Sequence, residues 1–461
     1  RDPEIGVRQD PATLPARPVG LVSLDLDWAS LTDAVAALAA GEISSVELLS
    51  AQLDRIDTFN PSVNAVVAFD IDRAMAEATA ADAARSAGDD LGPLAGVPLT
   101  LKDTWETAGC VTTAGAPTLA RHVPETDADV VAGLRDAGAV VYGKTNVPLF
   151  AGDHQSYNDV YGLTRNPWDP DRTAGGSSGG AAVSVACGFS LGEMGSDIGG
   201  SIRVPAHFNG VFGLKASWGV ISERGHIPGP PGTLSSTDLG VMGPMARTTG
   251  DLELLLDASL RHGAIKLGGV ASVPGAALPP AQPVDLAGLR VGVWLDDPVA
   301  PVDLITRNGV EHFAGQLEAA GASIDENARP GLASAELHDL YGRLLNPVMS
   351  AGLPASVRQR LEATVANTDG AALDGTDAPA SAAPGIDAGS VDDTAASVVP
   401  VGEATSSVTY RSAGACLVIG ELQAALATVA SLPSLSCSVF VPTPGARHID
   451  KRLLETGVAV F

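Results

Sequence analysis

Apolar residues recur at helical spacing near the start of the chain. The pattern predicts a helix over residues 28–41, where a closing glycine is a typical stop signal. A second helix is predicted over 44–60, because Ser44 precedes Glu47 by the spacing of a capping box. We expect this helix to end before Pro61, since the residue that precedes a proline avoids helical geometry.

Farther along, short apolar runs alternate with segments of helical periodicity. The predicted elements are strands over 64–69, 96–101 and 139–142, and helices over 71–86, 129–137 and 181–187. Strands that alternate with helices favour an α/β architecture. We therefore expect a mixed β-sheet core flanked by helices on both faces.

The composition excludes some classes of binding partner. The chain has 461 residues, 45% of them hydrophobic, so it can bury a large core and wholesale disorder is excluded. Its 28 Lys and Arg face 54 Asp and Glu, which gives a formal net charge of −26. Nucleic acids and anionic membranes are bound through clustered positive charge, so we expect neither as a partner. The four cysteines and eight histidines show no metal-binding spacing, so we expect no metal.

Two segments depart from the pattern of a folded domain. Residues 1–27 begin with a proline-rich stretch and are predicted to form an N-terminal arm. Residues 363–409 contain no Lys, Arg or aromatic residue, which predicts a mobile loop, with a passive surface insertion as the alternative. The length by itself suggests about three domains as a first expectation.

Candidate chemistry begins at Lys102, which follows a nearly continuous apolar run. A lysine at the end of a buried strand loses hydration, which lowers its pKa and provides a neutral amine as a base. The alternatives are a lysine that extends to the surface or one that pairs with Asp103.

Two glycine-rich segments carry serines. Residues 175–180 precede a predicted helix and could bind phosphate, but they lack the Lys-Ser/Thr ending of a nucleotide-binding loop. Residues 195–203 place Ser201 behind two glycines, where backbone amides can converge on an oxyanion. The 24-residue interval between Ser177 and Ser201 allows a helix and a returning strand to bring both loops to one face.

Together these segments resemble the amidase signature hydrolases over roughly residues 31–259. Supporting stretches are residues 143–146, 166–169 and 212–215. The resemblance implies the amidase signature fold, an α/β domain around a mixed sheet. It replaces the expectation from length by a single domain over 28–461, with a catalytic core over about 92–260. It also implies a stand-alone amidase of the bacterial type, including the kind that cleaves urethanes and aryl amides.

Carried over by position, the family's Ser–cis-Ser–Lys triad falls on Ser201, Ser177 and Lys102. Ser201 would be the nucleophile, and Ser177, after a cis peptide bond from Gly176, would relay its proton to neutral Lys102. The oxyanion hole would be formed by the amides of Ile198, Gly199 and Gly200, together with that of Ser201. The residues expected to support the site are Gly176, Ser178, Asp197 and Arg203, the last two in a structural role.

The resemblance implies hydrolysis of small amides through a serine acyl-enzyme, with no cofactor and with esters and carbamates as further substrates. We expect a cytoplasmic monomer or homodimer. One alternative is the glutaminase subunit of a tRNA-dependent amidotransferase, which would need partner chains. Another is a non-catalytic anion-binding or scaffold protein.

Some positions depart from the family pattern. Leu149 replaces a glutamate that is common in the Asn-x-Pro-Glu-Phe stretch, and the C-terminal third shows only a faint similarity. Substrate preference is therefore left open. His207 and His226 are expected to be structural or to line the pocket rather than to act in catalysis.

Overall fold

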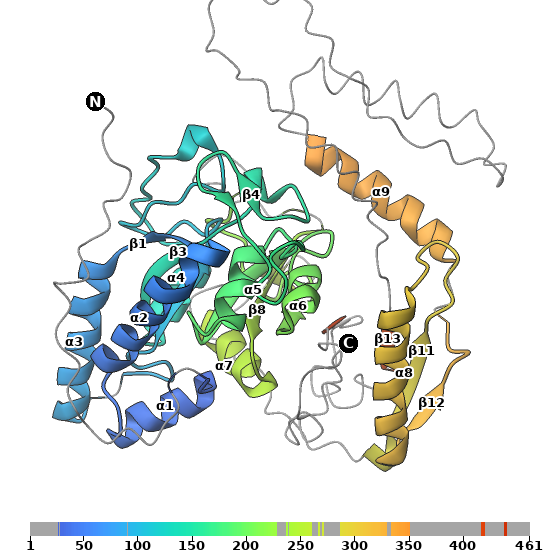
Figure 1. Ribbon diagram of the computed structural model, residues 1–461, viewed down its shortest axis with the longest axis horizontal. Coiled ribbons are helices and arrows are strands. Elements are labelled where there is room, and N and C mark those ends of the chain that lie inside the picture. Colours follow the sequence, from blue (N-terminus) through green and yellow to red (C-terminus); the bar gives the residue numbers. More distant parts are fainter. Residues whose placement is uncertain are drawn as a thin grey trace, which may run out of the picture. The chain divides into compact units, whose positions relative to one another are not determined.

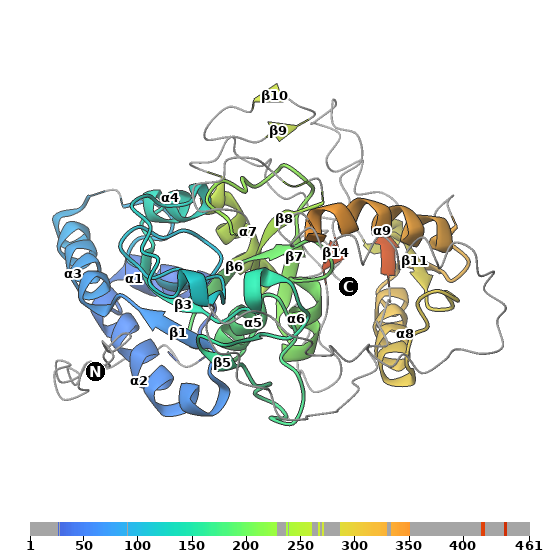
Figure 2. The same ribbon diagram turned by 90° about the horizontal axis from the view of Figure 1, so that it is seen from above.

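The structure is a computed structural model (Figures 1 and 2). The residues it describes are 26, 28–89, 91–227, 237, 239–260, 266–267, 270–271, 286–329, 333–350, 416–419 and 438–439. The chain divides into two compact units, residues 1–348 with 413–461 and residues 349–412, and the elements below belong to the first, apart from the end of one helix. The predicted loop over 363–409 and nearly all of the predicted arm over 1–27 lie outside the described residues, and the single-domain prediction stays a prediction.

The two predicted N-terminal helices are present. Helix α1 (Leu31–Ala40) ends at a left-handed glycine, and α2 (Ser45–Val63) begins with the capping box of Ser44 and Glu47. The prediction that α2 ends before Pro61 is wrong, because the helix continues to Val63 and stops at Asn64. A proline in the last turn removes only one helical hydrogen bond, and its fixed φ is compatible with a helix. Burial of the Val63 side chain favours the extra turn.

The strands form two main sheets, of which the first contains both parallel and antiparallel pairs. In the first sheet, of order β1-β3-β2, β3 pairs antiparallel with β1 and parallel with β2. The second sheet has the order β14-β7-β8-β6 and is antiparallel. Their strands are β1 (Val66–Phe69), β2 (Pro98–Lys102), β3 (Val140–Thr145), β6 (Gly192–Asp197), β7 (Phe212–Lys215), β8 (Val241–Ala246) and β14 (Ser438–Val439). The mixed sheet is therefore confirmed.

Helices pack on both faces of the strands, as predicted. Helix α5 contacts β2, β6 and β8, whereas α7 contacts β6, β7 and β8 and packs against α4. Helix α3 lies beside α2, as Figures 1 and 2 both show. The helices concerned are α3 (Ile71–Ala87), α4 (Asp129–Asp136), α5 (Gly179–Ala186), α6 (Arg203–Asn209) and α7 (Thr249–Ser259). Every residue of α5 is buried, and its small side chains allow the strands to approach closely.

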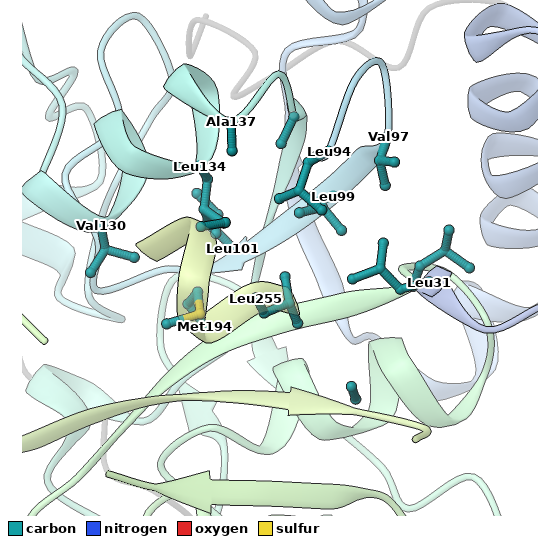
Figure 3. Close-up of a cluster of buried hydrophobic side chains, with 14 of the residues drawn as sticks. Leu31, Leu94, Val97, Leu99, Leu101, Val130, Leu134, Ala137, Met194 and Leu255 are labelled. Carbon is teal, nitrogen blue, oxygen red and sulfur yellow. The ribbon is translucent and has the colours of Figure 1, made fainter. Parts of the chain in front are cut away.

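The largest apolar cluster joins β2 to the helices (Figure 3). Leu99 and Leu101 of β2 are at most 1% exposed and pack with side chains of α1, α4, α7 and β6. The labelled members are Leu31, Leu94, Val97, Leu99, Leu101, Val130, Leu134, Ala137, Met194 and Leu255. Since Lys102 ends the same strand, this cluster fixes the position from which the lysine extends.

The remaining described elements form smaller groups. Strand β11 pairs parallel with β12 and antiparallel with β13. The elements are β4 (Tyr157–Asn158), β5 (Gly162–Leu163), β9 (Lys266–Leu267), β10 (Val270–Ala271), β11 (Arg290–Trp294), α8 (Leu304–Ala319), β12 (Ser323–Asp325), α9 (Ser334–Ser350), β13 (Cys416–Ile419) and the 3-10 turns Pro117–Leu119, Leu149–Ala151 and Leu286–Gly288. None of the described helices is long and apolar enough to span a membrane.

Candidate active site

Lys102 lies in the interior, at the end of β2, and its side chain is fully buried. Its Nζ donates hydrogen bonds of 2.8 Å to Ser177 Oγ and 2.8 Å to Ser196 Oγ. Burial lowers the pKa of Lys102 to about 7, although the charges of Asp197 and Glu193 act in the opposite direction. A lysine with this pKa is partly neutral near pH 7 and can accept a proton. The surface position considered from the sequence is therefore wrong.

The alternative partner of Lys102, Asp103, is engaged elsewhere. The Asp103 carboxylate accepts hydrogen bonds from the backbone N–H and the hydroxyl of Thr113. Burial raises the pKa of Asp103 to about 6, and the charge of Lys144 opposes this rise. Burial likewise raises the pKa of Glu193 to about 7, while the Glu193 carboxylate accepts a 2.6 Å hydrogen bond from Thr100. A layer of buried polar groups thus surrounds the lysine.

The peptide bond between Gly176 and Ser177 is cis, as the family resemblance implies. Gly176 lies against the backbone of residues 153–155, and a Cβ added to it would come within 2.7 Å of that backbone. Any larger residue would displace the loop, so glycine is required at this position. Ser177 Oγ thereby stays at Lys102, and α5 begins two residues later.

Ser201 follows β6 on a turn that leads into α6, and it is 5% exposed. The backbone N–H of Ser178 donates to the carbonyl of Ser201 at 3.1 Å, so the two serine-bearing loops are joined directly. Ser178 Oγ also lies 3.4 Å from the carbonyl of Ser196. The structure therefore places Ser177 in contact with Lys102 and holds the loop of Ser201 against the loop that carries Ser177.

Asp197 organises the turn that carries Ser201. Its carboxylate accepts from the amides of Gly200 and Ile202 and forms a two-pronged ion pair with Arg203. Burial alone would raise the pKa of Asp197, but the Arg203 charge and these hydrogen bonds hold it down at about 2. These contacts join Asp197 and Arg203 to the turn that carries Ser201, and their structural role stays a prediction.

The expected oxyanion hole differs from the geometry at one residue. The Gly200 N–H donates to Asp197 Oδ1 at 2.8 Å, and a single N–H that is already bonded is poorly placed for a second acceptor. Within the described part of the chain, the amides of Ile198, Gly199 and Ser201 have no hydrogen-bond partner. The carbonyls of Ile198 and Gly199 accept from Tyr341 Oη at 2.9 Å and contact His154 Nε2 at 3.0 Å.

Two contacts of the lysine site were not predicted. Ser196 belongs to the glycine-rich segment 195–203, yet only the assembled fold shows its hydroxyl between Lys102 and His226. A serine at the end of a strand that leads into this turn is the signal that could have identified it. His226 has no such signal, because it is distant in sequence from both partners. His207 lies beside Phe208, with 5.7 Å between ring centroids.

Comparison with known proteins identifies the family of this chain. The profile described as Amidase matches residues 47–353, so the chain belongs to the amidase family. The predicted family and fold are confirmed.

One curated relative, from Acidothermus cellulolyticus, is named as one of the subunits of glutamyl-tRNA(Gln) amidotransferase. It is 41% identical over 269 residues, which cover 58% of this chain and 52% of the relative. The chain thus spans about half the length of this relative.

Solved structures show the same fold. A fatty acid amide hydrolase superposes with a TM-score of 0.64 and 30% identity, covering 70% of this chain and 57% of that one. A peptide amidase from Stenotrophomonas maltophilia gives a TM-score of 0.54 and 34% identity, covering 64% of this chain and 61% of the other.

Proposed function

We propose that Lys102, Ser177 and Ser201 are the catalytic triad of this amidase. The observation that carries the proposal is the 2.8 Å contact between Lys102 Nζ and Ser177 Oγ, made by a fully buried lysine. The Ser178–Ser201 backbone hydrogen bond supports it, because it holds the nucleophile's loop against the relay serine. A buried amine beside a hydroxyl is the arrangement that activates a serine without histidine.

In the proposed reaction, Ser201 Oγ attacks the amide carbon. Its proton passes to Ser177 as the Ser177 proton passes to Lys102 Nζ. The tetrahedral oxyanion is stabilised by the amides of Ile198, Gly199 and Ser201. The relay then returns a proton to the leaving nitrogen, the C–N bond breaks, and water releases the acyl group from Ser201 by the same route.

For the substrate we propose a primary carboxamide, with glutamine first. The relatives of this chain that are named as glutamyl-tRNA(Gln) amidotransferase subunits support this choice over esters and carbamates. Such a subunit works with other chains, so protein partners belong to the proposal. With a net charge of −26, this chain is poorly suited to bind tRNA, and that contact would fall to the partners.

A stand-alone amide hydrolase is the second candidate. It is supported by the structural similarity to a fatty acid amide hydrolase and to a peptide amidase. Ester and carbamate hydrolysis, a monomeric or homodimeric state and a cytoplasmic location remain predictions.

A panel of substrates distinguishes the two candidate functions. Glutamine, an aliphatic primary amide, an anilide, a nitrophenyl ester and an aryl carbamate are incubated with the full chain and with the Ser201→Ala variant. Serine-dependent release of ammonia from glutamine supports the glutaminase. Turnover of the anilide without glutamine hydrolysis favours the stand-alone hydrolase, and equal turnover by Ser201→Ala refutes the assigned nucleophile.

A further inference from the structure

His226 is connected to the proposed base through one hydroxyl. Its Nε2 lies 2.9 Å from Ser196 Oγ, and Ser196 Oγ accepts a 2.8 Å hydrogen bond from Lys102 Nζ. The same Nζ lies 2.8 Å from Ser177 Oγ. The line of contacts from His226 to Ser177 therefore passes through Ser196 and Lys102.

The position of His226 is fixed by the segment that directly follows the lysine's strand. The segments around Trp105 and His226 form a short antiparallel bridge, and the Ile227 N–H donates to the carbonyl of Thr104 at 2.8 Å. The His226 ring packs edge-on against Trp105, with 4.7 Å between ring centroids. Trp105 Nε1 in turn donates to the carbonyl of Met194 on β6, the strand of Ser196. The segments that hold the imidazole are therefore bonded to the strands that carry Lys102 and Ser196.

The hydrogen bonds of Ser196 determine the tautomer of His226. Ser196 is 6% exposed, and its oxygen already accepts from Lys102. Its single proton therefore needs an acceptor, since a buried hydroxyl proton without one is costly. Among the described residues, His226 Nε2 is the acceptor in contact with Ser196 Oγ. This requires a neutral imidazole that carries its proton on Nδ1.

We propose that His226 is a positioning residue that accepts the Ser196 proton and thereby keeps the lone pair of neutral Lys102 for Ser177. A neutral amine has one lone pair, for which both neighbouring hydroxyls can compete. When Ser196 donates to His226, only Ser177 can donate to Lys102. This inference rests on the proposed triad.

The charges around both groups are compatible with this role. Burial, followed by the charges of Lys102 and Lys144, holds the pKa of His226 well below its usual value. His226 is therefore neutral throughout the range in which Lys102 titrates. Asp197 and Glu193 are the acidic groups that face Lys102, and both favour its protonated form.

The first test replaces His226 by a side chain without an acceptor. In His226→Leu, the Ser196 hydroxyl turns to the Lys102 lone pair, which stabilises the neutral amine and competes with Ser177. We expect the alkaline plateau of kcat to fall about tenfold, with little change in KM, and the midpoint of the pH profile to move to lower pH. His226→Gln, whose carbonyl can accept the Ser196 proton, should restore most of the activity. His122→Leu is the control, because His122 contacts Glu106 rather than this site.

A double-mutant cycle separates this role from general packing. The Ser196→Ala variant lacks the hydroxyl that competes for Lys102. In this variant, the additional change His226→Leu should alter kcat less than about twofold and leave the midpoint of the pH profile in place. Equal effects of His226→Leu in both backgrounds would overturn the proposal. An unchanged pH profile in the single variant would do the same.

The tautomer can be measured without any substrate. Imidazole ¹⁵N shifts, assigned by comparison with His226→Gln, should show an unprotonated Nε2 and a protonated Nδ1 from pH 6 to 9. A protonated Nε2 refutes the inference even if the enzyme is active. If the expected tautomer is found but the chain hydrolyses no amide, the proposed function is refuted, while the hydrogen bond from Ser196 to His226 is established.

Discussion

The two sides of strand β2 use burial in opposite ways. Leu99 and Leu101 enter the apolar cluster of Figure 3, whereas Thr100 and Lys102, between and after them, enter the polar layer at the site. All four side chains are at most 1% exposed. A fully buried leucine stabilises a fold by about 1.5–3 kcal/mol through removal of apolar surface from water. A buried amine gains nothing of this kind and must be satisfied by hydrogen bonds.

The difference shows how one strand can serve stability and chemistry together. The leucines hold β2 against α4 and α7, while Lys102 is buried away from water on the other side of the strand. The same exclusion of water lowers the pKa of Lys102 to about 7. Stability and reactivity at β2 should therefore respond to different substitutions.

The largest effect is expected from Ser201→Ala. Loss of the nucleophile should reduce kcat at least about 10⁴-fold, while the thermal unfolding temperature stays near that of the wild type. Rates are measured on the best substrate of the panel, with exposed Ser62→Ala as the control. If the variant loses both its fold and its activity, Ser201 contributes to stability in the way that the buried leucines of β2 do.

Lys102→Met should lower kcat about 10³-fold, because the neutral amine that accepts the proton is gone. In the wild type, the neutral form of Lys102 is active, so the rate should rise as pH increases through about 7. The variant should lose this rise. A pH series of initial rates from 5.5 to 9 decides the point, and a wild-type midpoint near 10 would show that burial does not activate this lysine.

Leu99→Ala tests the apolar side. It should destabilise the protein by about 2–5 kcal/mol through lost burial and the cavity left behind. Activity per folded molecule should change little, since Leu99 contacts the cluster and not the serines. Urea unfolding, with rates measured well below the transition, separates the two quantities. A large loss of kcat without destabilisation would show that the apolar side of β2 serves the chemistry and not only the stability of the fold.

Thr100→Val gives the smallest expected effect. It makes the polar side more apolar, yet it removes the hydroxyl bonded to Glu193 Oε1 and in contact with Ser184 Oγ. Leaving these buried groups unpaired should cost about 1–3 kcal/mol in the free energy of unfolding, measured by urea denaturation. Stabilisation by this change would mean that apolar area, rather than hydrogen bonding, dominates both sides of β2.

The sequence determined the elements and the chemical groups. Period and capping predicted α1 and the start of α2, because these signals act between residues a few positions apart. The apolar run before Lys102, the two glycine-rich segments and the family resemblance gave Lys102, Ser177 and Ser201 as the candidate triad. The structure places Ser177 in contact with Lys102 and joins the two serine-bearing loops. The error at Pro61 arose where the local rule competes with burial of Val63.

Only the tertiary structure decided how these groups act. The pKa of Lys102 follows from burial by segments distant in sequence. The bond from the Gly200 amide to Asp197 depends on the geometry of an assembled turn. The approach of His226 to Ser196 depends on how a loop residue is placed against strand β6. Hydration and hydrogen-bond direction are properties of an environment built by the whole fold, so no local pattern of residues contains them.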